Sequence, residues 1–208
     1  MKNVKFALLG LMFALSISNA QALTVNLVNN GGFEAQTVSG QYTTYSNASQ
    51  GLTGWTIGVG SVDLVSTALW NPASGENSLD LNGTKKGEIH QSLITTPSQL
   101  YQLSFDLAGN VFGTPSLKEM SVNVGGNSTY TFDITGKSAT NMGWTNYATK
   151  FFATEQSTTL SFLSNVSGNA GVALDNISVT AVPEAQTYSM MMLGLGLMGF
   201  IARRRRAD

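Results

Sequence analysis

The sequence predicts an all-β domain of the jelly-roll β-sandwich class. Apolar and polar residues alternate in short runs, as at 100–107, where Tyr101, Leu103, Phe105 and Leu107 occupy one face of a strand. Turns rich in glycine and asparagine separate these runs. The middle of the chain has no stretch with the apolar period of an amphipathic helix. Roughly ten short strands separated by such turns are typical of a two-sheet sandwich.

The chain begins with the pattern of a secretory signal peptide. Lys2 and Lys5 precede an apolar stretch that ends at Ile17, and small residues then form a cleavage site ending at Ala20 or Ala22. We therefore expect residues 1–20, or 1–22, to be removed on export.

The body that remains, residues 23–181, is long enough to bury the core of one domain. The polar segment 38–50 is expected to be a long loop. Strands are expected at 24–29, 55–65, 78–82, 87–94, 100–107, 120–124, 129–134, 146–153, 160–163 and 176–179.

The last part of the chain, 182–206, has three parts: Pro183 with Glu184, an uncharged apolar stretch at 189–202, and a basic cluster. As a helix, the apolar stretch would span roughly 21 Å, which is short against a bilayer core of about 30 Å. Four basic residues after an apolar segment favour retention on the cytoplasmic side. The sequence therefore predicts a short transmembrane helix that holds the protein transiently. The basic cluster is Arg203, Arg204, Arg205 and Arg206.

The charge of the body differs from that of the whole chain. The whole chain carries a net charge of −1, but the body has five lysines, no arginine and ten acidic residues, a net charge of −5. Nucleic-acid binding relies on Lys and Arg contacts to phosphate, so this composition argues against it. The chain has no cysteine, which excludes disulfides, zinc–thiolate sites and cysteine nucleophiles.

The C-terminal segment resembles the PEP-CTERM sorting domain of Gram-negative bacteria, although Ala185 stands where that pattern has its second proline. The resemblance implies recognition and removal of the tail by an exosortase. It also implies export through an inner-membrane intermediate to the cell surface or extracellular matrix, in a setting of exopolysaccharide production.

The body resembles the choice-of-anchor C family, which is related to plant cell-wall proteins. The similarity rests on blocks that occur in the expected order at 26–34, 77–83, 101–110 and 173–179. It implies a galactose-binding-like jelly roll outside the cytoplasm, and it leaves the biochemical activity open.

Glu34 and Asp175, near the two ends of the body, are candidates for a structural calcium site. First and last strands meet in galactose-binding-like folds, and Ca²⁺ takes carboxylate and carbonyl oxygens, which the turn at 29–32 could add. In the alternative, Glu34 accepts backbone N–H groups in the turn and Asp175 stabilises the final strand.

Aromatic residues in polar surroundings are candidates for stacking on a sugar ring. Trp70 lies in an apparent loop and is expected to be exposed, with Tyr42 and Tyr45 in the polar segment as further ligand contacts. Trp55, inside an apolar run, is expected in the core.

We expect a non-catalytic protein that binds carbohydrate or has a structural role within exopolysaccharide. His90 is the single histidine of the chain, and no Gly-x-Ser-x-Gly nucleophile motif occurs. A polysaccharide-modifying enzyme and a self-assembling matrix protein without a small ligand remain the alternatives. The expected partners are exosortase, the export machinery and extracellular polysaccharide.

Overall fold

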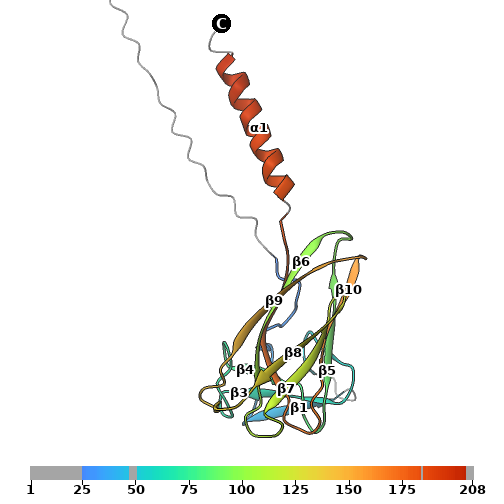
Figure 1. Cartoon of the computed structure of the whole chain (residues 1–208), viewed down its shortest axis with the longest axis vertical. Helices are drawn as coiled ribbons and strands as arrows, with labels where there is room; N and C mark the ends of the chain where they lie inside the picture. Colours follow the sequence, from blue (N-terminus) through green and yellow to red (C-terminus); the bar gives the residue numbers. More distant parts are fainter. Residues whose placement is uncertain (1–24, 47–50, 184, 205–208) are drawn as a thin grey trace, which may run out of the picture.

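The computed structural model describes residues 25–46, 51–183 and 185–204. The body consists of two antiparallel sheets packed face to face, and a helix extends beyond one end of it (Figure 1). The strands are β1 (Tyr42–Ser46), β2 (Thr56–Ile57), β3 (Ser61–Ser66), β4 (Asn77–Asp80), β5 (Glu88–Ile94), β6 (Leu100–Gly109), β7 (Leu117–Asn123), β8 (Asn127–Asp133), β9 (Thr145–Phe152), β10 (Ser157–Ser164) and β11 (Val172–Ala181); the helix is α1 (Ala185–Arg204).

The larger sheet has the order β1-β3-β4-β11-β6-β9, and the smaller has the order β2-β5-β10-β7-β8. The last strand, β11, thus lies in the middle of the larger sheet between β4 and β6. Strands β8 and β9, at the edges of different sheets, flank one open side of the sandwich (Figure 1). The predicted β-sandwich class is confirmed.

The core forms where the apolar faces of the two sheets meet. The alternation predicted for β6 holds, because Tyr101, Leu103, Phe105 and Leu107 are all buried. The Phe105 ring packs edge-on against Phe162 of the smaller sheet, with ring centroids 5.4 Å apart. These paired rings therefore lie between the two sheets, as the period-two pattern requires.

Three expectations for local structure were wrong. Residues 25–29 are not a strand, and Leu27 is tied to β11 by a bond from its backbone N–H to the Val179 carbonyl (2.8 Å). The expected strand 55–65 is divided into β2 and β3, because Gly60 turns the chain with a φ of 66°. Part of the expected loop 38–50 forms β1, whose backbone groups pair with β3 at the sheet edge.

The C-terminal segment does form a helix, but among residues 25–46, 51–183 and 185–204 no helix is long and apolar enough to cross a membrane. The expected transmembrane helix is therefore not supported. The predicted signal peptide lies outside the described residues.

The ends of the strands place several segments together at the end of the body nearest α1. Strand β6 begins there, β9 and β11 end there, and the β7–β8 turn lies there too. The C-terminal segment leaves from the same end, since the Val182 N–H donates to the Leu100 carbonyl (2.8 Å). We call this the tail-proximal end.

Candidate functional site

The Glu34 carboxylate binds the backbone at the start of β4. Its Oε1 accepts the backbone N–H groups of Glu76 (2.9 Å) and Asn77 (3.0 Å), and its Oε2 lies 3.4 Å from the Asn77 amide nitrogen. A Cβ on Gly75 would approach Oε1 too closely for any residue other than glycine to fit without moving the Glu34 side chain.

Asp175 holds the same segment from the last strand. Its Oδ2 accepts the N–H groups of Ala73 (3.0 Å) and Ser74 (3.1 Å), and its Oδ1 accepts that of Asn176 (2.7 Å). Burial raises the pKa of Asp175 to about 7, and the charge of Asp106 adds to this, while the three backbone hydrogen bonds act in the opposite direction.

The two predicted metal ligands are thus brought to one loop. A Cβ built on Gly32 would lie 3.9 Å from both Asp175 Oδ1 and Glu34 Cγ. The hydrogen bonding matches the alternative, in which these carboxylates accept N–H groups. Carboxylate oxygens are the right donors for calcium, but the described residues contain no group of three or more His, Cys, Asp or Glu placed to hold a metal. A calcium site at this loop stays a prediction.

Trp70 is not an exposed ring, and that expectation was wrong. The side chain is 2% exposed and its indole N–H donates to Ser78 Oγ (2.8 Å). The Phe112 ring stacks on it, with centroids 6.5 Å apart and planes 17° from parallel. The indole needs a polar partner when buried, and a serine hydroxyl on β4 supplies it. Trp55 is buried, as predicted.

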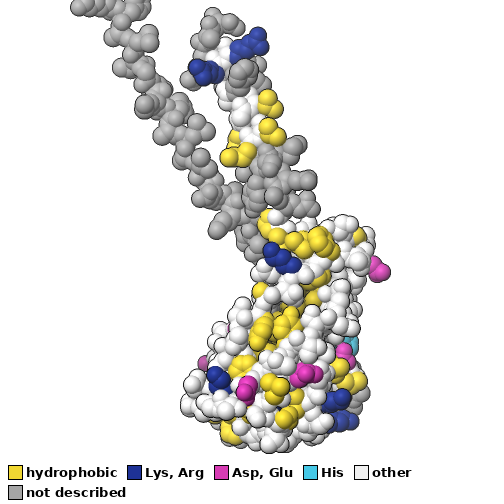
Figure 2. Space-filling model, in the orientation of Figure 1, with side chains coloured by type: hydrophobic (Ala, Val, Ile, Leu, Met, Phe, Trp, Pro, Cys, Tyr) yellow, Lys and Arg dark blue, Asp and Glu magenta, His cyan; other side chains and the backbone are white. Residues whose placement is uncertain are grey.

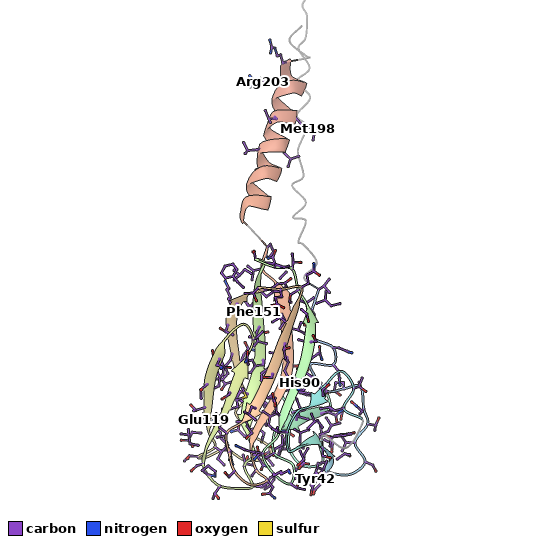
Figure 3. All side chains as sticks on the ribbon, turned by 90° about the vertical axis from the view of Figure 1, so that its right-hand side faces the viewer. Tyr42, His90, Glu119, Phe151, Met198 and Arg203 are labelled. Atoms are coloured by element: carbon purple, nitrogen blue, oxygen red, sulfur yellow. The ribbon has the colours of Figure 1, made fainter. Side chains whose placement is uncertain are left out.

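Tyr42 and Tyr45 lie on β1 rather than in a loop. They are three positions apart in a strand and so point to opposite faces of the sheet. Tyr42 is 51% exposed, whereas Tyr45 packs against the core. In Figure 3, Tyr42 lies at the end of the body away from α1. The two tyrosines cannot form one platform, and a ligand contact by either stays a prediction.

A groove of about 450 Å³ opens at the tail-proximal end, between the edge strands β8 and β9. The β7–β8 turn forms one wall and residues 149–152 form the other. Hydrophobic atoms form a strip over β8 and β9 in Figure 2, and Figure 3 shows Phe151 at the end of the body nearest α1.

The groove combines aromatic rings with polar groups. Phe152 is 63% exposed, and the neighbouring Phe151 is buried, where its ring stacks on Tyr101 with centroids 5.6 Å apart. Tyr130 contributes a half-buried ring that packs edge-on against Tyr147 (5.2 Å). The polar lining is Asn127, Ser128, Thr149, Lys150 and Thr154.

Sequence reasoning missed this groove. Phe151 and Phe152 fall within a correctly expected strand, and alternation along that strand exposes one of the two rings. The opposite wall comes from the β7–β8 turn, which is distant in sequence, so no local pattern joins the two. The available signal was the adjacent aromatic pair next to Lys150.

A second hollow, of about 460 Å³, lies beside Glu34. Its lining includes Glu76, Gln36, Asn77 and Thr67, and contains no aromatic ring. It offers hydrogen bonds without a stacking surface, so it fits a sugar ring less well than the β8–β9 groove does.

His90 lies on the outer face of the smaller sheet, in register with Thr56 and Ser161. Within the described part of the chain, its ring has no hydrogen-bond partner. This arrangement lacks the orienting carboxylate of a Ser-His-Asp triad.

Comparison with solved structures shows the fold. The carbohydrate-binding module TmCBM61, solved in complex with β-1,4-galactotriose, has a TM-score of 0.52 and 15% identity, covering 76% of this chain and 99% of that chain. A family 16 carbohydrate-binding module has a TM-score of 0.48 and 17% identity, covering 74% and 99% of the two chains. The predicted two-sheet β-sandwich is confirmed, and TmCBM61 shares this fold.

A sequence relative is halomucin of Haloquadratum walsbyi, which is 30% identical over 177 residues. The match covers 82% of this chain and 2% of halomucin, so the chain spans a very small part of that relative.

The PEP-CTERM protein-sorting motif matches residues 181–206. The predicted sorting signal is therefore confirmed, and the individual roles of Pro183, Glu184 and the arginines stay predictions. The motif indicates export, exosortase-dependent sorting and delivery to the cell surface. The body, at residues 26–180, matches the family described as "Protein of unknown function (DUF642)". The chain belongs to the DUF642 family.

Proposed function

We propose that this protein is an exported, non-catalytic polysaccharide-binding protein of the extracellular matrix, and that it holds its ligand in the β8–β9 groove. The observation that carries the proposal is an exposed phenylalanine, Phe152, in the lining of a groove that also contains the Tyr130 and Phe151 side chains and several amide and hydroxyl groups.

A pyranose ring matches this lining. Its C–H face is apolar and stacks on an aromatic ring, and the hydroxyls at its rim need donors and acceptors. Asn127 and Ser128 from the start of β8 and Thr149 from β9 offer such groups on both walls of the groove. Phe151 is held in the core and fixes the strand that presents Phe152.

Two comparisons support a carbohydrate ligand. TmCBM61, which shares the fold, was solved with a galactotriose, and carbohydrate-binding modules are non-catalytic. The sorting motif indicates export, which is compatible with a polysaccharide ligand outside the cell. Exopolysaccharide is therefore the ligand class that we propose.

Substitution at the groove tests this proposal. The full chain with Phe152→Ala is compared with Leu117→Ala, a control because Leu117 is 56% exposed and begins β7 at the other end of the body. Loss of a central aromatic contact costs about 1–2 kcal/mol, so we expect roughly 5- to 30-fold weaker binding on a glycan array for Phe152→Ala only.

Other outcomes would overturn the proposal. Equal binding by both variants would show that the groove is not the binding site. Loss of glycan binding in Tyr42→Ala would show that the site lies at β1. Release of shortened sugars from a bound polysaccharide would indicate an enzyme. Assembly that rises with protein concentration in glycan-free buffer would indicate a self-assembling matrix protein.

We further propose that the tail is cleaved near Glu184 during sorting, as the motif implies. Mass spectrometry of the exported protein should then find a C-terminus near this residue. An exported form that retains Arg203 and the following arginines would contradict processing.

A further inference from the structure

We propose that the groove selects acidic polysaccharides, specifically chains that carry uronate carboxylates, and that Lys150 is the residue that recognises the charge. This inference rests on the proposed function and adds a substrate class to it. It is carried by the single charged residue, Lys150, in a groove whose lining contains no acid.

Lys150 is placed by the register of β9. It lies opposite Gln102 of β6 and between Thr149 and Phe151, and all three of Thr149, Lys150 and Phe151 line the groove. Its side chain is exposed, and it has no hydrogen-bond or ion-pair partner among the residues that the structure describes. The ammonium is therefore free to pair with an anion on a ligand.

The other lysines of the described body are engaged or distant. Lys118 is buried and donates to the carbonyls of Gly113 (2.8 Å) and Ala170 (2.7 Å). The Lys137 side chain lies against Gly143. Lys85 and Lys86 lie in the turn before β5, at the end of that strand away from the tail. Lys150 is thus the free cation of the groove.

The negative charge of the body does not cancel this local effect. Glu155, the acid that follows the groove in sequence, lies in the turn between β9 and β10 and is not part of the lining. Exposed charges more than a Debye length apart, about 8 Å at physiological ionic strength, are largely screened from one another. Among the residues that line the groove, Lys150 is the one whose charge a ligand carboxylate would meet.

A single ammonium beside an aromatic ring indicates a modest charge density on the ligand. A uronate residue offers one carboxylate on a ring whose C–H face can stack on Phe152. Densely sulfated or phosphorylated chains would need several cations, and the lining supplies one.

Two polymers with the same backbone test the inference. Polygalacturonate carries a carboxylate on each sugar, and in its fully methyl-esterified form each carboxylate is replaced by an uncharged methyl ester. We expect the full chain to bind the acidic form about two- to fivefold more tightly, as an exposed ion pair allows. Lys150→Met should abolish that preference, and raising the salt concentration should reduce the preference in the unaltered chain. Lys85→Met is the matched control and should leave the preference unchanged.

The outcomes separate this inference from the proposed function. Equal binding of both polymers, or a preference that survives Lys150→Met, would overturn charge selection while leaving the groove as a neutral-glycan site. Failure of the unaltered chain to bind either polymer would also overturn it. If, in addition, Phe152→Ala changed no binding on the glycan array, the proposed function itself would fail.

Discussion

Gly171 should tolerate no side chain, because two buried polar groups occupy the space beside it. A Cβ at this position would lie 2.9 Å from Asp80 Oδ1 and closer still to the Asn82 side-chain oxygen. Asn82 is fixed by bonds from its amide nitrogen to the carbonyls of Val166 (2.9 Å) and Gly168 (2.8 Å). The substitution Gly171→Ala therefore forces Asn82, Asp80 or the start of β11 to move.

The expected cost follows from these contacts. Overpacking in a core costs roughly 1–3 kcal/mol. If Asn82 swings away instead, it leaves buried carbonyls unpaired, at about 1–3 kcal/mol each. Replacing glycine also reduces the conformational entropy of the unfolded chain, which stabilises the folded state by about 0.4–1 kcal/mol. We expect Gly171→Ala to lower the free energy of unfolding by about 3 kcal/mol.

Urea unfolding of the full chain, followed by the fluorescence of the buried Trp55 and Trp70, measures this cost. Gly32→Ala is the control, because a Cβ on Gly32 meets its neighbours only at 3.9 Å, an ordinary contact distance. In an Asn82→Ala background the clash is largely relieved, so Gly171→Ala should then cost about 1 kcal/mol, a coupling of about 2 kcal/mol.

The proposed clash at Gly171 would be refuted if Gly171→Ala and Gly32→Ala changed the free energy of unfolding equally, within about 0.5 kcal/mol. It would also be refuted if the cost of Gly171→Ala were the same with and without Asn82.

Two further predictions concern the buried carboxylates. If calcium binds between Glu34 and Asp175, it should raise the melting temperature of the full chain by about 2–4 °C per kcal/mol of binding free energy. The variant Asp175→Asn should remove this increase. Equal melting temperatures in calcium and in excess chelator would contradict the calcium site. Burial raises the pKa of Asp80 to about 7, so its contribution to stability is fully present below the unfolded pKa of about 3.9 and is lost as the pH rises through about 7. Between pH 5 and 6.5 this group should lower the free energy of unfolding by about 1.4 kcal/mol per pH unit. Asp80→Asn should make the profile less steep by that amount and leave the slope that Asp175 contributes, because its pKa is also raised to about 7; an unchanged slope would refute the assignment.

Much of the fold could be predicted because it depends on local alternation. Strand β6 shows this most clearly, since its buried residues are those that the period-two pattern selects. The errors lie where long-range pairing decides. The polar sequence of β1 has a weak strand signal, and it becomes a strand because its backbone pairs with β3 at a sheet edge. At 25–29 a strand-like sequence finds no continuous partner strand.

The site was predicted less well, for physical reasons. The approach of Glu34 to Asp175 was expected, because the first and last segments meet in this fold. The burial of Trp70 was not, because it depends on Ser78 of β4 and on Phe112 of the β6–β7 connection, which are distant from each other in sequence. The exposed Phe152 was missed because its role depends on the β7–β8 turn across the seam.

The two ends of the sandwich differ in their buried polar groups. At the end away from the tail, the Lys118 ammonium joins the carbonyls of Gly113 and Ala170, which belong to different loops. Asp80 joins Asn110 of one loop to Gly171 of the other. In a chain without cysteine, these charged bridges do the work of a disulfide in tying loops together.

The bridges at that end leave the tail-proximal end free to present an exposed aromatic ring. Burial lowers the pKa of Lys118, so the Lys118 bridge depends on its two carbonyls and on the charge of Asp80 to keep the proton. Lys118→Met would keep the volume and leave the two carbonyls unpaired, at a cost of about 2–5 kcal/mol. The same change should leave glycan binding at the β8–β9 groove unaltered wherever the variant remains folded. A loss of binding in folded Lys118→Met protein would show that the two ends are coupled, and would refute this division.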